Sequence, residues 1–221
     1  MRIFIVIPAY NEAGKIGGVV TAVRKQGHKD VVVVDDGSGD DTAGVATEAG
    51  AVVISHLVNR GQGAALKTGT EYAIRRGADI IVHFDADGQF LAEEIRDMVK
   101  PVEKGEARVT LGSRFLGKKS DLPFLKRFII MPLARLINRL LSGIKLTDPQ
   151  NGFRVMTAEV ARKIDWRSDR MAHCSEILFL LYHKGFRPKE IPVTVIYPDF
   201  GQRFGGGIRI LKDLFLARLI D

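Results

Sequence analysis

The chain has 221 residues, of which 46% are hydrophobic and 27% charged, and its net charge at pH 7 is +7. This composition excludes wholesale disorder, and the length suits one α/β domain with a sizeable core. The positive charge favours anionic partners such as nucleic acid, phosphorylated substrates or acidic lipid. The single cysteine, Cys174, cannot form an intrachain disulfide, which is typical of a reducing compartment.

Apolar, β-branched runs alternate with helix-like stretches through the first 115 residues. The runs lie at 3–7, 31–34, 51–54, 80–84 and 108–111, and the helix-like stretches at 12–26, 41–49, 62–76 and 91–104. This alternation predicts right-handed βαβ units and a doubly wound, mostly parallel sheet with helices on both faces. The first run stops at Pro8 and is too short for a signal peptide, so we expect a cytoplasmic protein.

The remainder, 116–221, has a different character but is not separated by a Gly-, Pro- or Ser-rich linker. We therefore interpret 1–221 as one domain with two halves. In chain order the second half contains a basic, apolar segment (124–141), a turn (147–149), a helix-like stretch (175–183), a strand (191–197) and an amphipathic stretch (208–220).

The segment 127–142 carries basic residues on one side of a wide apolar arc. Such an arc suits either burial in the core or contact with an anionic membrane surface, and we favour the membrane. The stretch 208–220 repeats this character. No run reaches the roughly 18 apolar residues of a spanning helix, so we expect peripheral contact. Nucleic-acid binding is not expected, because only Phe124 and Phe128 would be available to stack on bases.

An acidic motif, Asp85-Ala86-Asp87-Gly88-Gln89, follows the apolar run 80–84 directly. Asp and Gly favour turns for local reasons, so a simple turn is one interpretation. The other is a ligand site, since open α/β sheets bind ligands at the carboxyl ends of their strands. Two carboxylates at such a junction can converge on a hard cation, and Gln89 offers a third oxygen.

Two further strand ends carry polar residues. Asp36 ends the second run, and we expect it to contact a ligand, whereas Asp40, Asp41 and Thr42 are better explained as helix caps. The motif Pro8-Ala9-Tyr10-Asn11-Glu12 ends the first run, and its simplest structural interpretation makes Asn11 a helix cap. Three acidic strand ends facing one crevice are difficult to explain by stability alone.

The glycine-rich stretch 59–69 matches neither a P-loop nor a dinucleotide fingerprint, because Leu66 replaces a required glycine in both. Close loop packing is favoured over a phosphate cradle. His173, Cys174 and Glu176 lie too close together to indicate a zinc site, so His173 is interpreted as structural. Three glycines, 205–207, follow Arg203 and form either a flexible connector or a loop that brings Arg203 to a phosphate.

Taken together, these motifs, with Gly112-Ser113-Arg114 and Asp148-Pro149-Gln150-Asn151-Gly152-Phe153-Arg154, resemble family 2 inverting glycosyltransferases of GT-A fold. The similarity spans about residues 3–210 and is greatest to polyprenyl-phosphate (dolichol-phosphate) mannosyl- and glucosyltransferases. The resemblance implies an Mg²⁺ or Mn²⁺ site at Asp85, Asp87 and Gln89 and a GDP- or UDP-sugar donor. The nucleotide contacts that it implies are Pro8, Ala9, Tyr10, Glu12, Asp36, Asp85 and Ala86.

By the same resemblance, Arg114, Lys126 and Arg203 face the donor or acceptor phosphates, and Asp87, Arg114 and Arg203 are the expected catalytic residues. The match at Arg203 is the loosest, because family members usually have a Ser-Lys pair where this chain has Gly206-Gly207. Residues 1–115 would form the nucleotide-sugar half and 116–221 an acceptor half with membrane-facing segments.

The expected reaction is transfer of mannose or glucose to a polyprenyl phosphate at the cytoplasmic face of the membrane. A lipid phosphate is already an oxyanion and needs no strong base. A neutral hydroxyl acceptor would need one, for which Glu176 or Asp148 are the candidates. Two alternatives stay open: a glycosyltransferase with a soluble acceptor, and a catalytically silent protein that binds nucleotide sugars.

Overall fold

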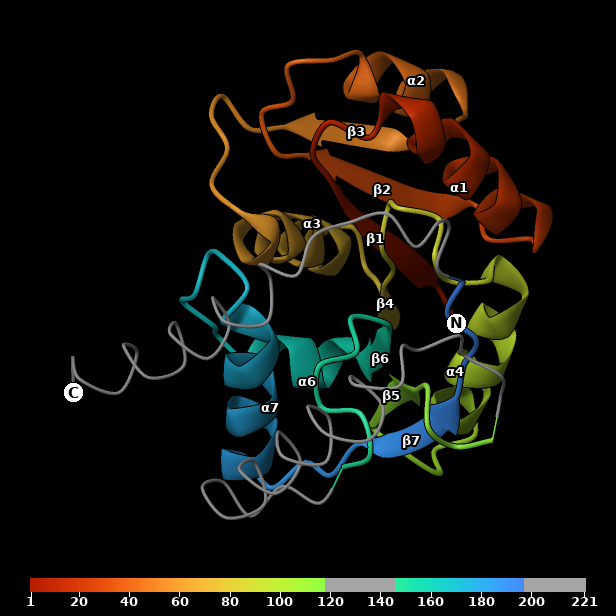
Figure 1. The fold of residues 1–221 in the computed structure, drawn as a ribbon. Helices are drawn as coiled ribbons and strands as arrows, with labels where there is room; N and C mark the ends of the chain where they lie inside the picture. Colours follow the sequence, from red (N-terminus) through yellow and green to blue (C-terminus); the bar gives the residue numbers. More distant parts are fainter. Residues whose placement is uncertain (118–145, 197–221) are drawn as a thin grey trace, which may run out of the picture.

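The structure, a computed structural model, describes residues 1–117 and 146–196 (Figure 1). Within these residues seven strands form one sheet, in the order β3-β2-β1-β4-β6-β5-β7. All neighbouring pairs are parallel except those that involve β6, which is antiparallel to both β4 and β5. The strands are β1 (Ile3–Ala9), β2 (Asp30–Asp35), β3 (Val52–Ser55), β4 (Ile80–His83), β5 (Val109–Ser113), β6 (Arg154–Thr157) and β7 (Lys189–Pro192).

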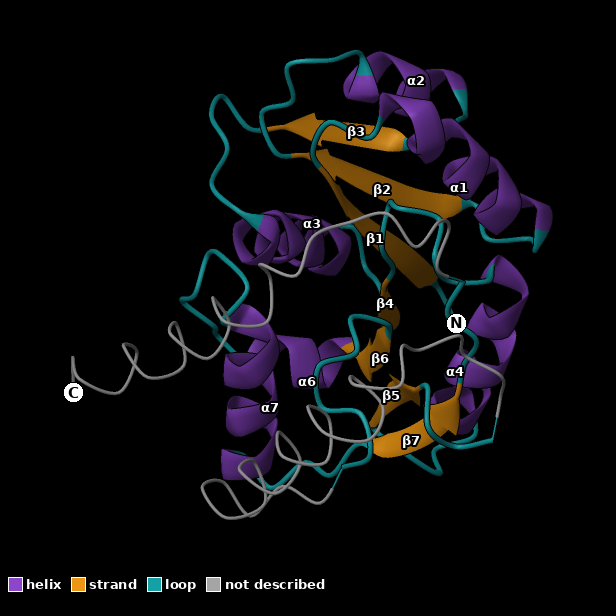
Figure 2. Ribbon diagram, in the orientation of Figure 1, coloured by secondary structure: helices purple, strands orange, loops and turns teal. Residues whose placement is uncertain are grey.

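Helices cover both faces of the sheet, as the alternation of runs predicts (Figure 2). One core cluster lies under α1, α2 and α4, and the other lies under α3, α6 and α7. None of the described helices is long and apolar enough to cross a bilayer. The helices are α1 (Ala13–Lys25), α2 (Thr42–Glu48), α3 (Gln62–Arg75), α4 (Ile95–Glu103) after the 3-10 turn η1 (Ala92–Glu94), α6 (Ala158–Lys163) and α7 (His173–His183).

The inner strands are continuous apolar runs because both of their faces are buried. In β1, Ile5 and Ile7 pack into the cluster under α1, whereas Phe4 and Val6 pack into the cluster under α3. Each of the four side chains is at most 2% exposed. A strand that alternates between two cores in this way cannot tolerate a polar residue on either face, so the runs in the sequence locate the centre of the sheet.

The second half of the described chain departs from the sequence expectation. Strand β6 and helix α6 were not predicted, and β6 inserts between β4 and β5 in the antiparallel direction. The strand expected at 191–197 is present with earlier bounds: β7 covers Lys189–Pro192, and within 193–196 Val195 forms only an isolated bridge to Phe90. Short strands of four residues carry too little periodicity to be detected alone. The expected segments 124–141 and 208–220 lie outside the described residues.

The parallel strands bring their carboxyl ends to one edge of the sheet. The segments that follow β1, β2, β4 and β5 therefore emerge on the same side, and they contain the motifs singled out in the sequence. Because β6 runs the other way, the segment that precedes it, including Gly152, emerges at this edge too. The fold thus gathers polar groups from both described parts of the chain.

Candidate active site

The acidic motif lies immediately beyond β4, and both of its proposed roles have a structural basis. The backbone N–H of Gln89 donates to Asp87 Oδ1 at 3.0 Å, and Gly88 has a positive φ of 74°, so the segment is a turn. Asp85 points toward the start of α3, where Gln62 Nε2 donates to its Oδ1 at 3.0 Å. Both carboxylates are half-buried. The turn is the scaffold that holds the two acidic groups close together.

Gly152 packs directly against the Asp85 carboxylate. A Cβ atom built on Gly152 would lie 2.8 Å from Oδ2 and 3.2 Å from Oδ1 of Asp85. The first distance is shorter than side-chain contacts in folded proteins allow, so only glycine fits here without displacing the carboxylate. Gln62 and Gly152 together confine Asp85, one by a hydrogen bond and the other by close backbone approach.

Burial raises the pKa of Asp85 to about 7, and the neighbouring charge of Asp87 acts in the same direction. Arg154 and His173 oppose this rise. Two carboxylates that repel each other in a partly dry environment are stabilised by a divalent cation, which takes oxygen ligands. The donor set therefore fits Mg²⁺ or Mn²⁺. No group of three His, Cys, Asp or Glu side chains suited to a metal occurs in the described residues, and the role of Gln89 stays a prediction.

Arg114 follows β5 and donates three hydrogen bonds to Asp148, one from its backbone N–H and two from its guanidinium. Its Nε donates to Asp148 Oδ2 at 2.6 Å and its Nη2 to Oδ1 at 2.7 Å, and the Asp148 side chain is fully buried. Asn151 Nδ2 also donates to Asp148, at 3.2 Å. A bidentate pair fixes the plane of the guanidinium as well as its position. Asp148 is therefore a positioning partner of Arg114, and this pairing does not favour it as the base that a hydroxyl acceptor would need.

The other candidate base, Glu176, is also engaged. Its two carboxylate oxygens accept the backbone N–H groups of Arg167 and Ser168, each at 2.8 Å. This arrangement ties the loop that precedes α7 to the first turn of that helix, where a negative charge is favourable. Glu176 therefore has a structural role, and these bonds do not favour it as the base for a hydroxyl acceptor.

Asp36, at the end of β2, accepts three hydrogen bonds and is only 2% exposed. Oδ1 is bonded to His56 Nδ1 at 2.7 Å and to the N–H of Arg60 at 3.1 Å, and Oδ2 accepts the N–H of Gly61 at 2.6 Å. These bonds clamp the loop between β3 and α3. A carboxylate retains further acceptor capacity after three bonds, so the expected nucleoside contact stays a prediction.

The remaining nucleotide-side residues follow β1. Pro8 and Ala9 are buried, whereas Tyr10 is 49% exposed and presents its ring to solvent. Asn11 does not cap α1 as expected: it has a left-handed φ of 55°, and its Oδ1 accepts the N–H of Gly39 at 2.8 Å. The N-cap position belongs to Glu12, which has no side-chain capping bond.

Residues 40–42 have the structural role that the sequence favours. Asp40 accepts the N–H groups of Ala13 and Thr42, each at 3.1 Å, and so satisfies donors at the starts of both α1 and α2. Thr42 Oγ1 in turn accepts the N–H of Glu12 at 2.8 Å. Asp41 occupies the N-cap position of α2 but makes no side-chain capping bond. The carboxylate at position 40, rather than 41, joins the two loops.

The glycines at the start of α3 serve close packing, as expected. A Cβ atom on Gly61 would lie 2.4 Å from the carbonyl oxygen of Asp169, and one on Gly63 would lie 2.2 Å from that of Ser168. The Asp169 carbonyl also accepts the N–H of Ala64 at 3.2 Å. One donor at this helix start is therefore already bonded to protein, which is not the geometry of a phosphate cradle.

His173 is structural in the described chain. It is 1% exposed, its Nδ1 is bonded to the carbonyl oxygen of Arg170 at 2.8 Å, and its Nε2 lies 3.4 Å from Cys174 Sγ. Burial, with the nearby charge of Arg154, lowers the pKa of His173 to about 4, so the imidazole is neutral at pH 7. Lys126 and Arg203, the other predicted phosphate-facing residues, lie outside the described residues.

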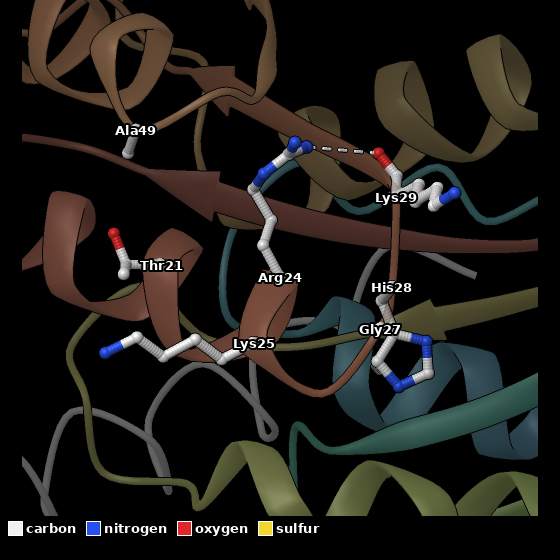
Figure 3. Close-up of a pocket in the computed structure, with 7 residues that line it drawn as sticks. All are labelled: Thr21, Arg24, Lys25, Gly27, His28, Lys29 and Ala49. Carbon is white, nitrogen blue, oxygen red and sulfur yellow. Dashed lines mark hydrogen bonds between the residues drawn. The ribbon is translucent and has the colours of Figure 1, made fainter.

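A separate basic hollow of about 360 Å³ lies at the opposite edge of the sheet, beside the end of α1 (Figure 3). Arg24 extends across it and donates to the carbonyl oxygens of Gly50, at 2.8 Å, and Lys29, at 3.4 Å. Basic side chains at a helix carboxyl terminus stabilise the helix dipole. The hollow is accounted for by this structural role and lies away from the acidic pair.

A doubly wound sheet with one antiparallel inner strand and an acidic pair beyond β4 is the arrangement of the GT-A fold. The crystal structure of glucosyl-3-phosphoglycerate synthase from Mycobacterium tuberculosis in complex with Mg²⁺ and uridine-diphosphate has this fold. It superimposes with a TM-score of 0.74 at 18% identity, over 98% of this chain and 78% of the other.

Residues 4–165 match the family model of Glycosyl transferase family 2, and the chain belongs to that family. Polyprenol monophosphomannose synthase of Mycolicibacterium smegmatis is 31% identical over 228 residues, which cover 97% of this chain and 84% of the relative. UDP-N-acetylglucosamine--dolichyl-phosphate N-acetylglucosaminyltransferase of Methanococcus voltae is 29% identical over 239 residues, with 99% and 95% covered. The protein is therefore a glycosyltransferase.

The sequence interpretation overlooked three groups that shape the site. Gln62 and Gly152 confine Asp85, and Asp148 orients Arg114. All three lie within sequence motifs that carry the family resemblance or indicate loop packing, so the sequence marks these segments as candidates for the site. Their roles depend on contacts between segments 23 to 67 residues apart, which local patterns do not report.

Proposed function

We propose that this glycosyltransferase moves a hexose, mannose or glucose, from a GDP- or UDP-sugar to a polyprenyl phosphate, with inversion and with dependence on Mg²⁺ or Mn²⁺. The observation that carries the proposal is that an acidic pair and an oriented guanidinium lie at one edge of the sheet. Asp85 and Asp87 are neighbouring carboxylates whose charges repel, and Arg114 is oriented beside β5 by the buried Asp148. The names of the two relatives above, both of which refer to polyprenol or dolichyl phosphate, support the choice of acceptor.

In this proposal residues 1–115 bind the donor. Asp85, Asp87 and Gln89 hold the cation, which when bound neutralises charge on the departing diphosphate. The nucleoside lies against the segments that follow β1 and β2, where Tyr10 presents an exposed ring. The proposed nucleotide contacts are Pro8, Ala9, Tyr10, Glu12, Asp36, Asp85 and Ala86.

Residues 116–221 contribute the acceptor side, with Arg114 at the boundary. We assign the acceptor phosphate to Arg114, Lys126 and Arg203. A phosphate oxygen forms the new bond to the anomeric carbon while the bond from that carbon to the diphosphate oxygen breaks. The configuration inverts because attack and departure occur on opposite faces, and the electron pair leaves with the nucleoside diphosphate.

No proton has to be removed from a phosphate oxyanion during this step. The step therefore needs no base. This agrees with the hydrogen bonds that already occupy Asp148 and Glu176, the two carboxylates considered as bases for a hydroxyl acceptor. A neutral hydroxyl would need a base in hydrogen-bond reach. The bonding of these two groups therefore favours a phosphate acceptor over a sugar or other alcohol.

The deciding experiment is a transfer assay over GDP- and UDP-sugars with a short-chain polyprenyl phosphate, with and without Mg²⁺ or Mn²⁺. We expect a lipid-linked sugar of inverted configuration only when cation is present. Product with soluble phosphate acceptors but not with the lipid would favour the soluble-acceptor alternative. Nucleotide-sugar binding without turnover would favour a silent binding protein.

We further propose that the enzyme is peripheral at the cytoplasmic face of the membrane. The basic, amphipathic stretches 127–142 and 208–220 support this placement through their composition. Flotation with vesicles of anionic and zwitterionic lipid tests it. We expect the protein to bind vesicles only when they contain anionic lipid, and to bind more weakly as salt is added. Absence of the protein from both vesicle fractions would contradict peripheral membrane binding.

A further inference from the structure

Three buried side-chain nitrogens of the described residues have no hydrogen-bond partner in the protein, and all belong to one neighbouring pair. They are Nε and Nη1 of Arg154 and Nδ1 of His83. Arg154 on β6 lies directly opposite His83 on β4 in the sheet register, and the two residues are 2% and 1% exposed. Buried polar groups are nearly always bonded in native proteins, so a cluster of such atoms points to a functional requirement.

The remaining nitrogen of Arg154 is held only by long contacts. Nη2 lies 3.4 Å from the carbonyl oxygen of Asn151 and 3.4 Å from Cys174 Sγ. A buried guanidinium costs much free energy unless a negative charge compensates it. Arg154 is 2% exposed, so an apolar side chain of similar volume at this position would avoid the cost of burying a charge.

The groups that face Arg154 from the packed elements identify its counter-charge. His83 on β4 and His173 on α7 both have their pKa lowered by burial and by the charge of Arg154, so neither is charged at pH 7. Cys174, also on α7, contacts Nη2. Arg154 opposes the rise in the pKa of Asp85, so the Asp85 carboxylate senses the charge of the guanidinium.

Asp85 and Arg154 lie close in the fold without forming a direct ion pair. Asp85 comes two residues after His83, and Gly152, two residues before Arg154, packs against the Asp85 carboxylate. Two buried charged groups that interact but are too far apart for a direct hydrogen bond are commonly bridged by ordered water.

We propose that Arg154 is a positioning residue for Asp85: Nε and Nη1 bind ordered water that orients the Asp85 carboxylate toward the cation and the donor diphosphate. The inference deepens the proposed function, because it concerns the cation site of that reaction. Arg154 does not touch substrate in this scheme. It acts like the residues that hydrogen-bond to metal ligands and orient them. Removing such a residue typically weakens metal binding about 10- to 100-fold.

A purely structural arginine makes the opposite prediction for stability. If Arg154 served only to hold β6, its removal would lower the melting temperature of the metal-free protein. If it is retained for Asp85, an apolar replacement of similar volume relieves a buried charge and leaves that temperature unchanged or raised. Cation affinity and stability then move in opposite directions, which a structural role does not produce.

The test compares Arg154→Met and Arg154→Lys with the wild type and with Arg75→Met, a matched change at an arginine whose side chain is 81% exposed. Mn²⁺ affinity is measured by calorimetry and by electron paramagnetic resonance, the melting temperature is measured in EDTA, and kcat and KM are measured for the donor. We expect Arg154→Met to bind Mn²⁺ about 10- to 100-fold more weakly without a lower melting temperature. Arg154→Lys should recover part of the affinity, and Arg75→Met should match the wild type.

Mn²⁺ affinity within twofold of the wild type in Arg154→Met would overturn the proposal. Failure of both Arg154 variants to fold would also overturn it, as would a loss of Mn²⁺ affinity accompanied by a lower melting temperature in EDTA. Either result would show that Arg154 has a purely structural role. The outcome is independent of the transfer assay. If the wild type transfers no sugar but its Mn²⁺ affinity depends on Arg154, the proposed function fails and this inference stands.

Discussion

Two sets of carboxylates at the same edge of the sheet differ in burial and in how their charges are compensated. Asp36 and Asp148 accept hydrogen bonds on both oxygens, three from a loop for Asp36 and a bidentate pair from Arg114 for Asp148. Asp85 instead lies beside the like charge of Asp87, and its pKa rises to about 7. The compensated carboxylates build the frame. Asp85 and Asp87, here called the uncompensated pair because within the described residues neither forms a direct ion pair and each accepts a single hydrogen bond, are the part of the site that gains most from a ligand.

The largest expected effect breaks the uncompensated pair. Asp87→Asn removes one of the two repelling charges, so the metal-free protein should be as stable as the wild type or slightly more stable. Transfer should fall about 10²- to 10³-fold, the range observed when a group that stabilises transition-state charge is lost. Steady-state kinetics at saturating Mn²⁺ and thermal unfolding in EDTA measure the two effects. Full turnover would remove Asp87 from the mechanism.

The second prediction breaks a compensated carboxylate. Asp36→Asn leaves at least one of three buried donors without its charged acceptor, and should cost about 1–3 kcal/mol of unfolding free energy. For a chain of this size that loss corresponds to a melting temperature lower by several degrees. Glu48→Gln, at an exposed position on α2, is the control and should be neutral. Equal stability of the two variants would show that Asp36 does not clamp the 56–61 loop.

A third variant disturbs the confinement of Asp85 without changing any charge. Gly152→Ala places a methyl group 2.8 Å from Asp85 Oδ2, so the carboxylate must shift. We expect a loss of roughly tenfold in kcat/KM, comparable with other small displacements of positioned groups. Gly18→Ala is the matched control, because nothing lies within 4 Å of its added methyl and it lies inside α1. That control should stabilise the protein by about 0.5–1 kcal/mol.

The last prediction is a pH dependence of stability, to which Asp85 of the uncompensated pair contributes. The folded-state pKa of Asp85 is raised to about 7, so the metal-free folded protein binds its proton more tightly than the unfolded chain does. Stability from this group is present at low pH and is lost as pH rises from about 4 to 7. His173, with a pKa lowered to about 4, acts in the opposite direction over much of this interval.

The contribution of Asp85 to the pH dependence of stability is measured as the difference between Asp85→Asn and the wild type. In EDTA, the stability of Asp85→Asn relative to the wild type should increase between pH 4 and 7 and then level off, as followed by denaturant unfolding. Mn²⁺ affinity of the wild type should weaken below about pH 7, because a ligating carboxylate must be ionised. A stability difference that does not vary with pH would show that Asp85 titrates normally.

Much of this design was predictable from local patterns. The runs 31–34 and 80–84 identify inner strands because both faces of a doubly wound sheet are buried, and the residues that follow them must emerge at the carboxyl edge. The acidic motif at 85–89 is predictable because it follows directly from the run 80–84. The sequence also favours close packing for the glycines at 61 and 63, but their partners, the carbonyls of Asp169 and Ser168, are distant in sequence.

The tertiary structure alone decided the insertion of β6 between β4 and β5, the pairing of Arg114 with Asp148, and the placement of Arg154 behind Asp85. Hydrophobic periodicity encodes which face of an element is buried, but not which distant element covers it. Asp148, which reads as a turn residue or a base, is fully buried and paired. Its role, like that of Arg154, follows from charges brought together by chain folding, and those contacts have no local signature.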